Sequence, residues 1–236
     1  MSAPPSSPEF QLSSVAFFGR TFDEYVQFFG LDPANLAGRR VLDVAAGPSS
    51  FTAEAQARGV PAVAVDPLYG FSTDTLAAHV QIDYARMRQE MLRREGQFRY
   101  KYFPSLAAAE ASRRSAADRF LADYEAGFVR SRYVGARLPR LPFADGAFDL
   151  VLCAHLLFIY ARHLDYGFHF AACRELARVS AGEVRLHPIC GPDGQPYPEL
   201  PRLQAALGRE GIAARVIPVD YEFFAGGDST LVLSKN

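Results

Sequence analysis

Two short apolar runs joined by a helix-like segment constrain the fold of this chain more than any other feature. The first run, RRVLDVA, leads into a turn of small residues at 45–50, and the second, PAVAVDP, covers 61–67. Both contain few polar side chains, as is typical of strands whose two faces are covered. Between them, the stretch from Ser49 to Arg58, closed by Gly59, has helical character. The sequence therefore predicts a parallel βαβ unit with a right-handed crossover.

The rest of the chain continues this alternation of strands and helices. We expect strands at 133–138, at 148–154 and in GEVRLHPI, and helices at 165–179 and in PELPRLQAALGREG. An amphipathic helix in RTFDEYVQFFGLDP precedes the first strand, and the last residues, AARVIPVDYEFFAGGDSTLVLSKN, predict a hairpin around Gly226–Gly227. Such alternation predicts an α/β fold, with a doubly wound, mainly parallel sheet and helices on both faces.

One segment is too long for this scheme. Residues 68–132 separate the second strand from the third, whereas an α/β connection needs only a few residues and one helix. We interpret this insertion as two or three helices that form a lid over one end of the sheet, within a single domain covering 15–236. Residues 1–14 are rich in Pro and Ser, which predicts a disordered tail.

Arginine dominates the insertion: Arg86, Arg88, Arg93, Arg94, Arg99, Arg113, Arg114, Arg119, Arg130 and Arg132. Three interpretations are open. The helices can present a solvated face of mixed charge, or a lid that offers guanidinium groups to an anionic acceptor. They can also bind RNA, with Tyr100, Tyr102 and Phe103 stacking on bases. The acidic residues interspersed along the segment favour the solvated face, and RNA is the weakest of the three.

Charge and composition narrow the partners and the compartment. A formal net charge of −1 provides no general attraction for nucleic acid or an anionic membrane. No apolar run approaches the ~20 residues that span a bilayer, and the N-terminus lacks the basic and apolar blocks of a secretory signal. The three cysteines fit buried thiols in a reducing compartment better than disulfides. We therefore expect a cytoplasmic protein.

The turn at 45–50 indicates which ligand the sheet can hold. Ligands of open α/β sheets bind beyond the carboxyl ends of the strands, and Asp43, Asp66 and His155 all fall at such ends. We therefore expect these three side chains to line one crevice. A dinucleotide loop needs several glycines and free N–H groups near the pyrophosphate, but this turn has only Gly47, and Pro48 removes one N–H.

A ligand without phosphates needs less from the turn, and S-adenosylmethionine, with its amino-acid end, sulfonium and ribose, is such a ligand. We expect Asp43 to attract its ammonium group and Asp66 to accept hydrogen bonds from both ribose hydroxyls. The small residues at 45–47 let the backbone pass close to the ligand. Ser49 or Ser50 can cap the following helix and meet the ligand carboxylate.

Four segments carry a resemblance to a known family. VLDVAAGPSSF, AVAVDP, LPFADGAFDLVLCAHLLF and ELARVSAGEVRL follow one another over most of the chain from Val41 onward, the insertion excepted. Together they resemble the class I S-adenosylmethionine-dependent methyltransferases. The resemblance implies a seven-stranded Rossmann-like sheet with an antiparallel last strand. It also implies that the first segment is motif I, with Asp43 as its acid and Gly47 as its second glycine, while Ala45 and Ser49 replace the first and third.

The resemblance assigns further residues around the cofactor. Asp66 matches the ribose-binding acid, and the stretch Leu138–Pro142 lies where the family contacts adenine. The stretch Cys153–His155, which includes Ala154, matches the family's loop after the fourth strand, which flanks the methyl group and the acceptor. The chain departs from the family before the fifth strand, where Ala181-Gly182-Glu183 stands in place of paired glycines.

The role of each histidine is interpreted from its position in the predicted elements. His155 is the candidate general base, since it ends a central strand and imidazole titrates near neutrality; the alternative is a hydrogen-bonded histidine packed under the lid. The spacing of His163 and His169 matches no zinc pattern, so we interpret them as solvated or core residues and expect no metal site. A buried structural position is favoured for His187. For Arg20, a surface position is favoured over contact with the cofactor carboxylate.

We therefore predict an S-adenosylmethionine-dependent methyltransferase that acts on a small or medium-sized acceptor at O, N or C. Its partner is then a small molecule, not a membrane or nucleic acid. The alternative is a non-catalytic protein of the same fold that binds S-adenosylmethionine or another nucleoside, and a cavity beside His155 would separate the two. The turn argues against an NAD-dependent oxidoreductase. Four aromatic residues are acceptor-pocket candidates, although core packing is favoured for most: Tyr69, Tyr160, Tyr221 and Phe158.

Overall fold

The computed structural model describes residues 15–235, and the tail predicted at 1–14 lies outside them. The helices and strands are α1 (Phe22–Phe29), β1 (Val41–Val44), α2 (Phe51–Ala57), β2 (Ala62–Asp66), α3 (Thr73–Arg93), α4 (Leu106–Val129), β3 (Tyr133–Gly135), β4 (Phe148–Ala154), α5 (Tyr166–Val179), β5 (Ser180–His187), α6 (Leu200–Arg209), β6 (Ile212–Pro218) and β7 (Ser229–Lys235). Two short 3₁₀ turns, Pro33–Leu36 and Glu95–Gln97, complete the described elements.

The seven strands form one sheet in the order β3-β2-β1-β4-β5-β7-β6. Neighbouring strands are parallel except for β7, which runs antiparallel to both β5 and β6. The predicted doubly wound, mainly parallel, seven-stranded sheet with an antiparallel last strand is therefore confirmed. Because the chain winds outward in both directions from β1 and β4, the strand order reverses between them, and ligands of such sheets bind at this reversal.

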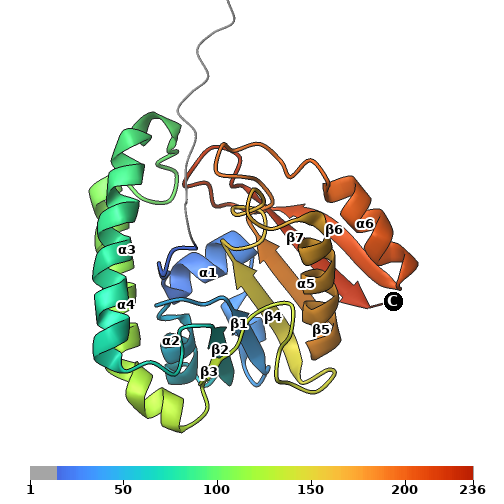
Figure 1. Ribbon diagram of the computed structural model, residues 1–236, viewed down its shortest axis with the longest axis horizontal. Coiled ribbons are helices and arrows are strands. Elements are labelled where there is room, and N and C mark those ends of the chain that lie inside the picture. Colours follow the sequence, from blue (N-terminus) through green and yellow to red (C-terminus); the bar gives the residue numbers. More distant parts are fainter. Residues whose placement is uncertain (1–14, 236) are drawn as a thin grey trace, which may run out of the picture.

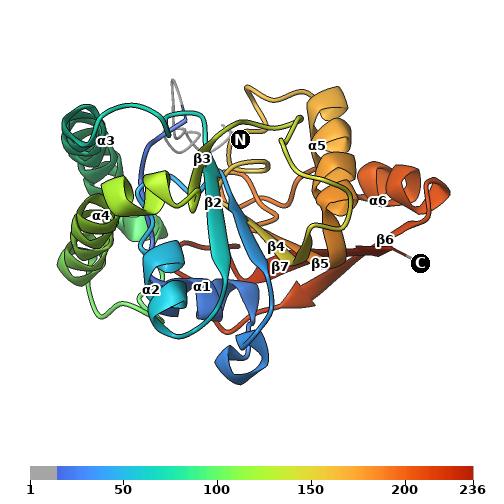
Figure 2. The same cartoon turned by 90° about the horizontal axis from the view of Figure 1, so that it is seen from below.

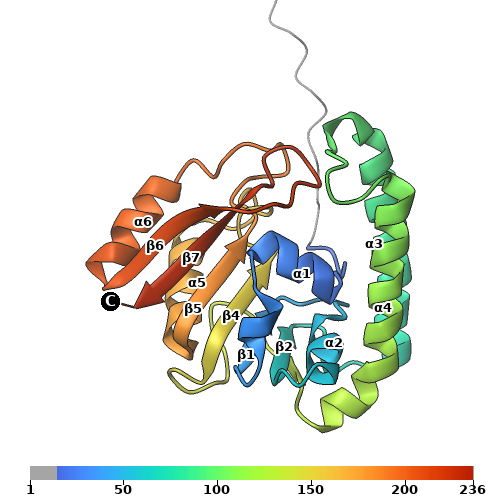
Figure 3. The ribbon, with the colours of Figure 1, turned by 180° about the vertical axis from the view of Figure 1, so that it is seen from behind.

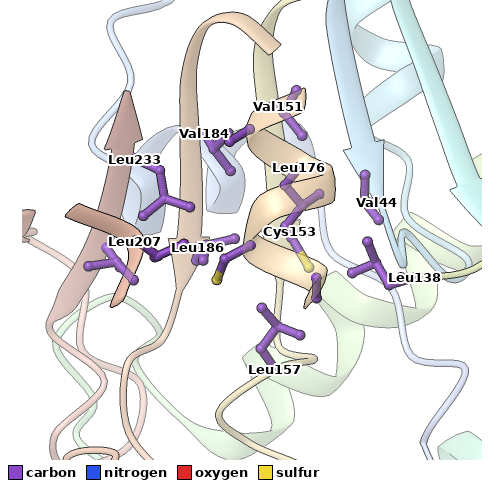
Figure 4. Close-up of a cluster of buried hydrophobic side chains, with 14 of the residues drawn as sticks. Val44, Leu138, Val151, Cys153, Leu157, Leu176, Val184, Leu186, Leu207 and Leu233 are labelled. Atoms are coloured by element: carbon purple, nitrogen blue, oxygen red, sulfur yellow. The ribbon is translucent and has the colours of Figure 1, made fainter. Parts of the chain in front are cut away.

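Helices cover both faces of the sheet. Helices α5 and α6 lie on one face, and α1 and α2 lie on the other (Figures 1 and 2). In the layer under α5, Leu176 packs towards Val151, Cys153 and Val184 of the central strands (Figure 4). All four of these side chains are at most 2% exposed, so the central strands are apolar on the α5 face as the sequence predicts. The three cysteines are buried free thiols.

The insertion forms two long helices that lie side by side. Helices α3 and α4 pack on each other, and α4 also contacts α2 and β3 (Figure 1). Each begins at a serine whose hydroxyl accepts a hydrogen bond from a first-turn N–H, Ser72 in α3 and Ser105 in α4. The helices predicted at 68–132 are therefore present, and they flank the α1–α2 side of the sheet.

The tip of this α3–α4 hairpin meets the loop at 219–228 that joins β6 and β7 (Figure 3). The Arg99 N–H donates to the Phe223 carbonyl at 2.8 Å, and Phe98 forms a β-bridge with Phe224. The contact encloses space beyond the carboxyl ends of the strands, which gives the insertion its place in the site described below.

Two glycines explain local departures from the sequence prediction. The third strand ends at Gly135, earlier than the predicted 138, and a Cβ on Gly135 would lie 2.2 Å from the Tyr69 carbonyl oxygen. Gly182 lies within β5 where its register with β4 shifts, and a Cβ there would lie 2.4 Å from the Asp149 carbonyl oxygen. The single glycine of Ala181-Gly182-Glu183 thus permits close strand packing.

Within 15–235, none of the helices combines the length and the apolar character that crossing a membrane requires.

Candidate functional site

A cavity of about 670 Å³ lies at the carboxyl ends of β1, β2 and β4. Its volume is within the range of small-molecule pockets, about 300–1,000 Å³. The strand ends contribute Gly47, Asp66, Ala154 and His155 to the lining, while α3, α4 and the 219–228 loop supply the opposite walls. The cavity therefore occupies the position where the strand order reverses.

Asp66 is held rigidly at the edge of this cavity. Its Oδ2 accepts a hydrogen bond from the Gly47 N–H at 3.0 Å, and its Oδ1 accepts one from the Leu68 N–H at 2.9 Å. Burial raises the pKa of Asp66 to about 6, although the two N–H donors oppose the shift. Each oxygen keeps a lone pair for a further donor, so the carboxylate can accept two hydroxyl groups from a ligand.

Asp43 does not line the cavity, so the prediction that it shares one crevice with Asp66 and His155 is wrong. The side chain is fully buried, and the Tyr25 hydroxyl donates to its two oxygens at 2.9 and 3.1 Å. Burial raises the pKa of Asp43 well above its usual range, Tyr25 opposes this, and the charge of Asp66 adds to it. Helix α1 separates Asp43 from the cavity, because its Tyr25 side chain occupies the space in front of the carboxylate.

The turn between β1 and α2 brings small residues to the cavity wall. Ala45 and Gly47 both line the cavity, and both adopt left-handed backbone conformations, with φ of 58° and 57°. Glycine adopts this region freely, whereas alanine does so at a cost of about 1 kcal/mol or more. The Tyr69 hydroxyl donates to the Gly47 carbonyl at 2.6 Å, and this hydrogen bond holds the turn in place.

The N-terminal side of α2 is covered by residues 17–20, which cross over the turn. The Ser50 N–H and the Ser49 hydroxyl both donate to the Arg20 carbonyl, and Ser49 Oγ accepts from the Phe51 N–H. Ser50 makes no capping bond and instead donates to Glu54. Neither serine lines the cavity, so a ligand carboxylate reaches them only if residues 17–20 move.

Substitution of Gly19 by alanine is expected to destabilise the protein by about 1–3 kcal/mol or more, because a new Cβ would lie 2.0 Å from the Pro48 carbonyl oxygen. Urea denaturation measures the loss. Gly96→Ala is the matched control, since a Cβ there meets nothing within 4 Å. Equal stability of the two variants would contradict the tight crossing of residues 17–20 over the turn.

Arg20 is buried and lines the cavity, so the surface position favoured from the sequence is wrong. Its Nη1 donates to the carbonyls of Phe18 and Gly19, and its Nε makes no hydrogen bond within the described residues. Burial lowers the pKa of Arg20, and the neighbouring Arg113 charge lowers it further. The three phenylalanines at 17, 18 and 22 were the available sequence signal that this arginine lies among apolar residues.

A buried ion pair links the insertion to α1. Arg113 Nη2 lies 3.2 Å from Glu24 Oε1, and these two side chains are only 1% and 0% exposed. Arg20 Nε lies 3.8 Å from the same oxygen, to which the Tyr221 hydroxyl also donates. Two guanidinium groups thus share one carboxylate. No sequence pattern marks Glu24 as buried, because acidic residues in a first helical turn are usually solvated and interact with the helix dipole.

The other arginines of the insertion divide between two of the sequence interpretations. Arg88 pairs with Glu110, and Arg93 with Glu90, on the partly exposed outer surface, as expected for a solvated face of mixed charge. Arg94 and Arg113 differ, since both are buried and both line the cavity. The insertion therefore brings two cationic side chains to the cavity wall.

His155 follows β4 with a left-handed φ of 52° and faces the cavity. The backbone N–H of His155 donates to the His187 carbonyl, and the ring Nδ1 has no partner among the described residues. Burial lowers the pKa of His155 well below its usual range, and the Arg20, His187 and Arg113 charges act in the same direction. The imidazole is therefore neutral at physiological pH and a weak proton acceptor.

The remaining predicted residues separate into cavity and core. Leu138, Ala154 and Tyr160 line the cavity. His187 is buried, as favoured from the sequence, and its Nδ1 lies 3.0 Å from Thr230 Oγ1. His169 is a core residue whose ring nitrogens meet the Asp165 and Leu157 carbonyls. In the described part of the chain, no three His, Cys, Asp or Glu side chains are grouped to hold a metal ion.

The strand order, with its antiparallel β7, is the one that the resemblance to the class I S-adenosylmethionine-dependent methyltransferases implies. No protein-family model matches the chain. An uncharacterized protein of Methanocaldococcus jannaschii is 29% identical over 225 residues, which cover 95% of this chain and 98% of that protein. The similarity therefore extends through the insertion as well as the sheet.

Solved structures with similar folds include methyltransferases of low sequence identity. Magnesium protoporphyrin IX methyltransferase from Synechocystis, solved with bound SAM, is 16% identical with a TM-score of 0.49, over 91% of this chain and 78% of that one. A TehB-like SAM-dependent methyltransferase from Corynebacterium glutamicum is 13% identical with a TM-score of 0.46, over 86% and 87% of the two chains.

Proposed function

We propose that this chain is an S-adenosylmethionine-dependent methyltransferase that acts on a small-molecule acceptor. The observation that carries the proposal is the position of Asp66. Its carboxylate lies at the end of β2, oriented by two backbone N–H groups, on a cavity that continues past Ala154 to His155. This arrangement suits a ligand with a diol at Asp66 and a reactive group further along the cavity.

The cavity-lining residues fit S-adenosylmethionine. Asp66 can accept both ribose hydroxyls, and the side chains of Leu138 and Ala154 offer an apolar surface for the adenine. Ala45 and Gly47 keep the turn narrow enough for close approach. Arg20 has a buried Nε without a hydrogen-bond partner within the described residues, and it takes the role of holding the cofactor carboxylate that the sequence suggested for Ser49 or Ser50. Asp43 accepts hydrogen bonds from Tyr25 and is a positioning residue next to the turn.

S-adenosylmethionine supplies a methyl group on a sulfonium, which passes to an acceptor lone pair while the electrons of the broken carbon–sulfur bond remain on sulfur. The protein's part is to hold the acceptor in line, and such positioning accounts for about 7–11 kcal/mol in favourable cases. The walls from α3, α4 and the 219–228 loop exclude water from the acceptor. Among the described residues His155 Nδ1 has no partner, so the neutral imidazole can orient the acceptor by a hydrogen bond. Its low pKa makes it a weak base for an acceptor that loses a proton.

The cavity beside His155 favours an enzyme over the non-catalytic alternative. A protein that only binds the cofactor needs no space beyond it, whereas here the lining extends to Ile159, Leu164 and Phe168 and to Met87 of α3. This extra space is available to a second, smaller molecule.

Calorimetric titration of the protein with S-adenosylmethionine and with S-adenosylhomocysteine tests the proposal. We expect one binding site for each compound, and a thermal-shift comparison in which S-adenosylhomocysteine, but not NAD, stabilises the protein. Absence of binding by both sulfur compounds would exclude the proposed function, and stabilisation by NAD alone would favour the oxidoreductase.

The affinity for S-adenosylmethionine is expected to fall as the pH is lowered through about 6. Burial raises the pKa of Asp66 to about 6, so the carboxylate is protonated below this pH and accepts hydrogen bonds from the ribose less well. One proton linked to binding lowers the affinity by up to about ten-fold per pH unit. Calorimetry between pH 5 and 8 measures the effect. Asp66→Asn should bind weakly at every pH; a wild-type pH profile in this variant would assign the titration elsewhere.

A further inference from the structure

At the hairpin tip, the cavity has an apolar wall that the cofactor residues do not use. Met91 from α3, Phe98 from the hairpin tip, and Phe223 and Phe224 from the 219–228 loop contribute to it. These segments meet through the Arg99–Phe223 backbone hydrogen bond described above, so the wall is a built feature of the fold. Aromatic and thioether side chains of this kind favour an apolar ligand body.

A cationic group lies at the same end of the cavity. Arg20 and Arg113, 9% and 1% exposed, share the single carboxylate of Glu24, and each has an Nε without a hydrogen-bond partner within the described residues. Arg94, 6% exposed, lines the cavity beside Gln97. The Arg113 guanidinium carbon lies 5.2 and 4.8 Å from the ring centroids of Phe103 and Phe223, so its surroundings are otherwise apolar.

Within the described residues of this region, two buried cations share one carboxylate, which leaves one positive charge without a counter-ion. An uncompensated buried charge is unfavourable unless a ligand supplies the opposite charge. Guanidinium groups match acidic groups in geometry, because their parallel N–H bonds meet two oxygens. Bound S-adenosylmethionine adds a sulfonium and an ammonium to its one carboxylate, so it increases the need for an anion.

We propose that the cationic end of the cavity, formed by Arg94 and Arg113, binds the acidic group of an otherwise apolar acceptor. The inference rests on the proposed function and names the substrate class for it: a small organic acid, such as an aryl or alkyl acid, rather than an uncharged alcohol or amine. Arg20, next to the turn, is assigned to the cofactor, and Arg113, next to the Phe223 ring, is assigned to the acceptor.

The test uses the protein saturated with S-adenosylhomocysteine and three acids, each paired with its uncharged amide: benzoate, 4-phenylbutyrate and decanoate. Calorimetry should find at least one acid that binds about ten-fold or more tightly than its amide, as expected for a hydrogen bond to a charged group. Phenylphosphonate, compared with benzoate, distinguishes a dianionic from a carboxylate ligand. If no acid binds more tightly than its amide or uncharged counterpart, the inference is overturned.

Variants locate the binding group. Arg94→Gln should weaken the bound acid by about ten-fold and leave its amide and S-adenosylhomocysteine unaffected. Arg93→Gln, on the exposed side of the same helix, is the matched control and should change nothing. Because Arg113 is paired, it is tested as Glu24→Gln/Arg113→Gln, which removes both charges and should also weaken the acid selectively once thermal melting has verified folding. Equal losses for acid and amide in both folded variants would overturn the inference.

The outcomes separate this inference from the proposed function. Failure of the wild type to bind S-adenosylhomocysteine removes the proposed function and the inference with it. Binding of S-adenosylhomocysteine without preference for any acid removes the inference alone.

Discussion

Replacement of Glu24 by glutamine is expected to lower the free energy of unfolding by about 3–5 kcal/mol, as for other buried ion pairs that lose one partner. Glu24 is fully buried, and its Oε1 is shared by Arg113, Arg20 and the Tyr221 hydroxyl. Glutamine keeps the shape but removes the charge, which leaves two guanidinium groups buried without a counter-ion. Urea denaturation at neutral pH measures the loss.

The matched control for this prediction is Glu199→Gln. Glu199 also pairs with an arginine, Arg202, but both side chains are largely exposed, and such pairs contribute about 0–1 kcal/mol. The double variant Glu24→Gln/Arg113→Gln should recover part of the stability that Glu24→Gln loses, because one of the two stranded charges is then absent. Similar losses in the two glutamate variants would mean that the buried pair does not organise the contact between α1 and α4.

Replacement of Asp66 by alanine is expected to weaken S-adenosylmethionine binding by about 100-fold or more. Two hydrogen bonds from ribose hydroxyls to a charged acceptor contribute about 1.5–3 kcal/mol each. The Gly47 and Leu68 N–H groups also lose their acceptor, so the turn that shapes the cavity loses a constraint. Calorimetric titration of the wild type and the variant gives the two dissociation constants.

Asp145→Ala serves as the control for Asp66→Ala, because Asp145 is 79% exposed, pairs with Arg178 and lies outside the cavity. Its affinity for S-adenosylmethionine should equal that of the wild type. Wild-type affinity in Asp66→Ala would reject this cofactor site, since Asp83, the other carboxylate among the described lining residues, already accepts the Phe17 N–H and pairs with Arg86.

The elements of the sheet could be predicted because their signals are local. The strand predicted at 148–154 is observed as β4 with the same bounds, and the helix predicted at 165–179 begins one residue later, at Tyr166. Buried parallel strands appear as apolar runs, and glycines mark the ends of several elements: Gly30, for example, ends α1 with a left-handed φ of 61°. Because Asp66 and His155 lie at the ends of predicted strands, the sequence also predicted that both line one cavity, as they do.

The charged residues of the site could not be predicted in the same way. Glu24 and Tyr221 are 197 residues apart in the chain yet share a hydrogen bond, and no local pattern marks either. Arg113 is one of several arginines in α4, and the sequence does not distinguish it from the exposed Arg114 and Arg119. Its side chain is enclosed where α4 packs on α2 and Arg113 reaches Glu24 of α1. Asp43 matches a motif position, and only the packing of α1 brings the Tyr25 hydroxyl in front of it.

Three features follow from the amino-acid sequence alone: the alternation of strands and helices, the sheet class, and the strand ends at which Asp66 and His155 stand. Backbone periodicity and chain direction are encoded within each segment. Tertiary structure alone decided which charges are buried, which acids face the cavity, and that the α3–α4 tip closes on the 219–228 loop. These properties depend on solvent exclusion between segments that are distant in the chain, and the energy of a charge depends on that exclusion more than on the residue itself.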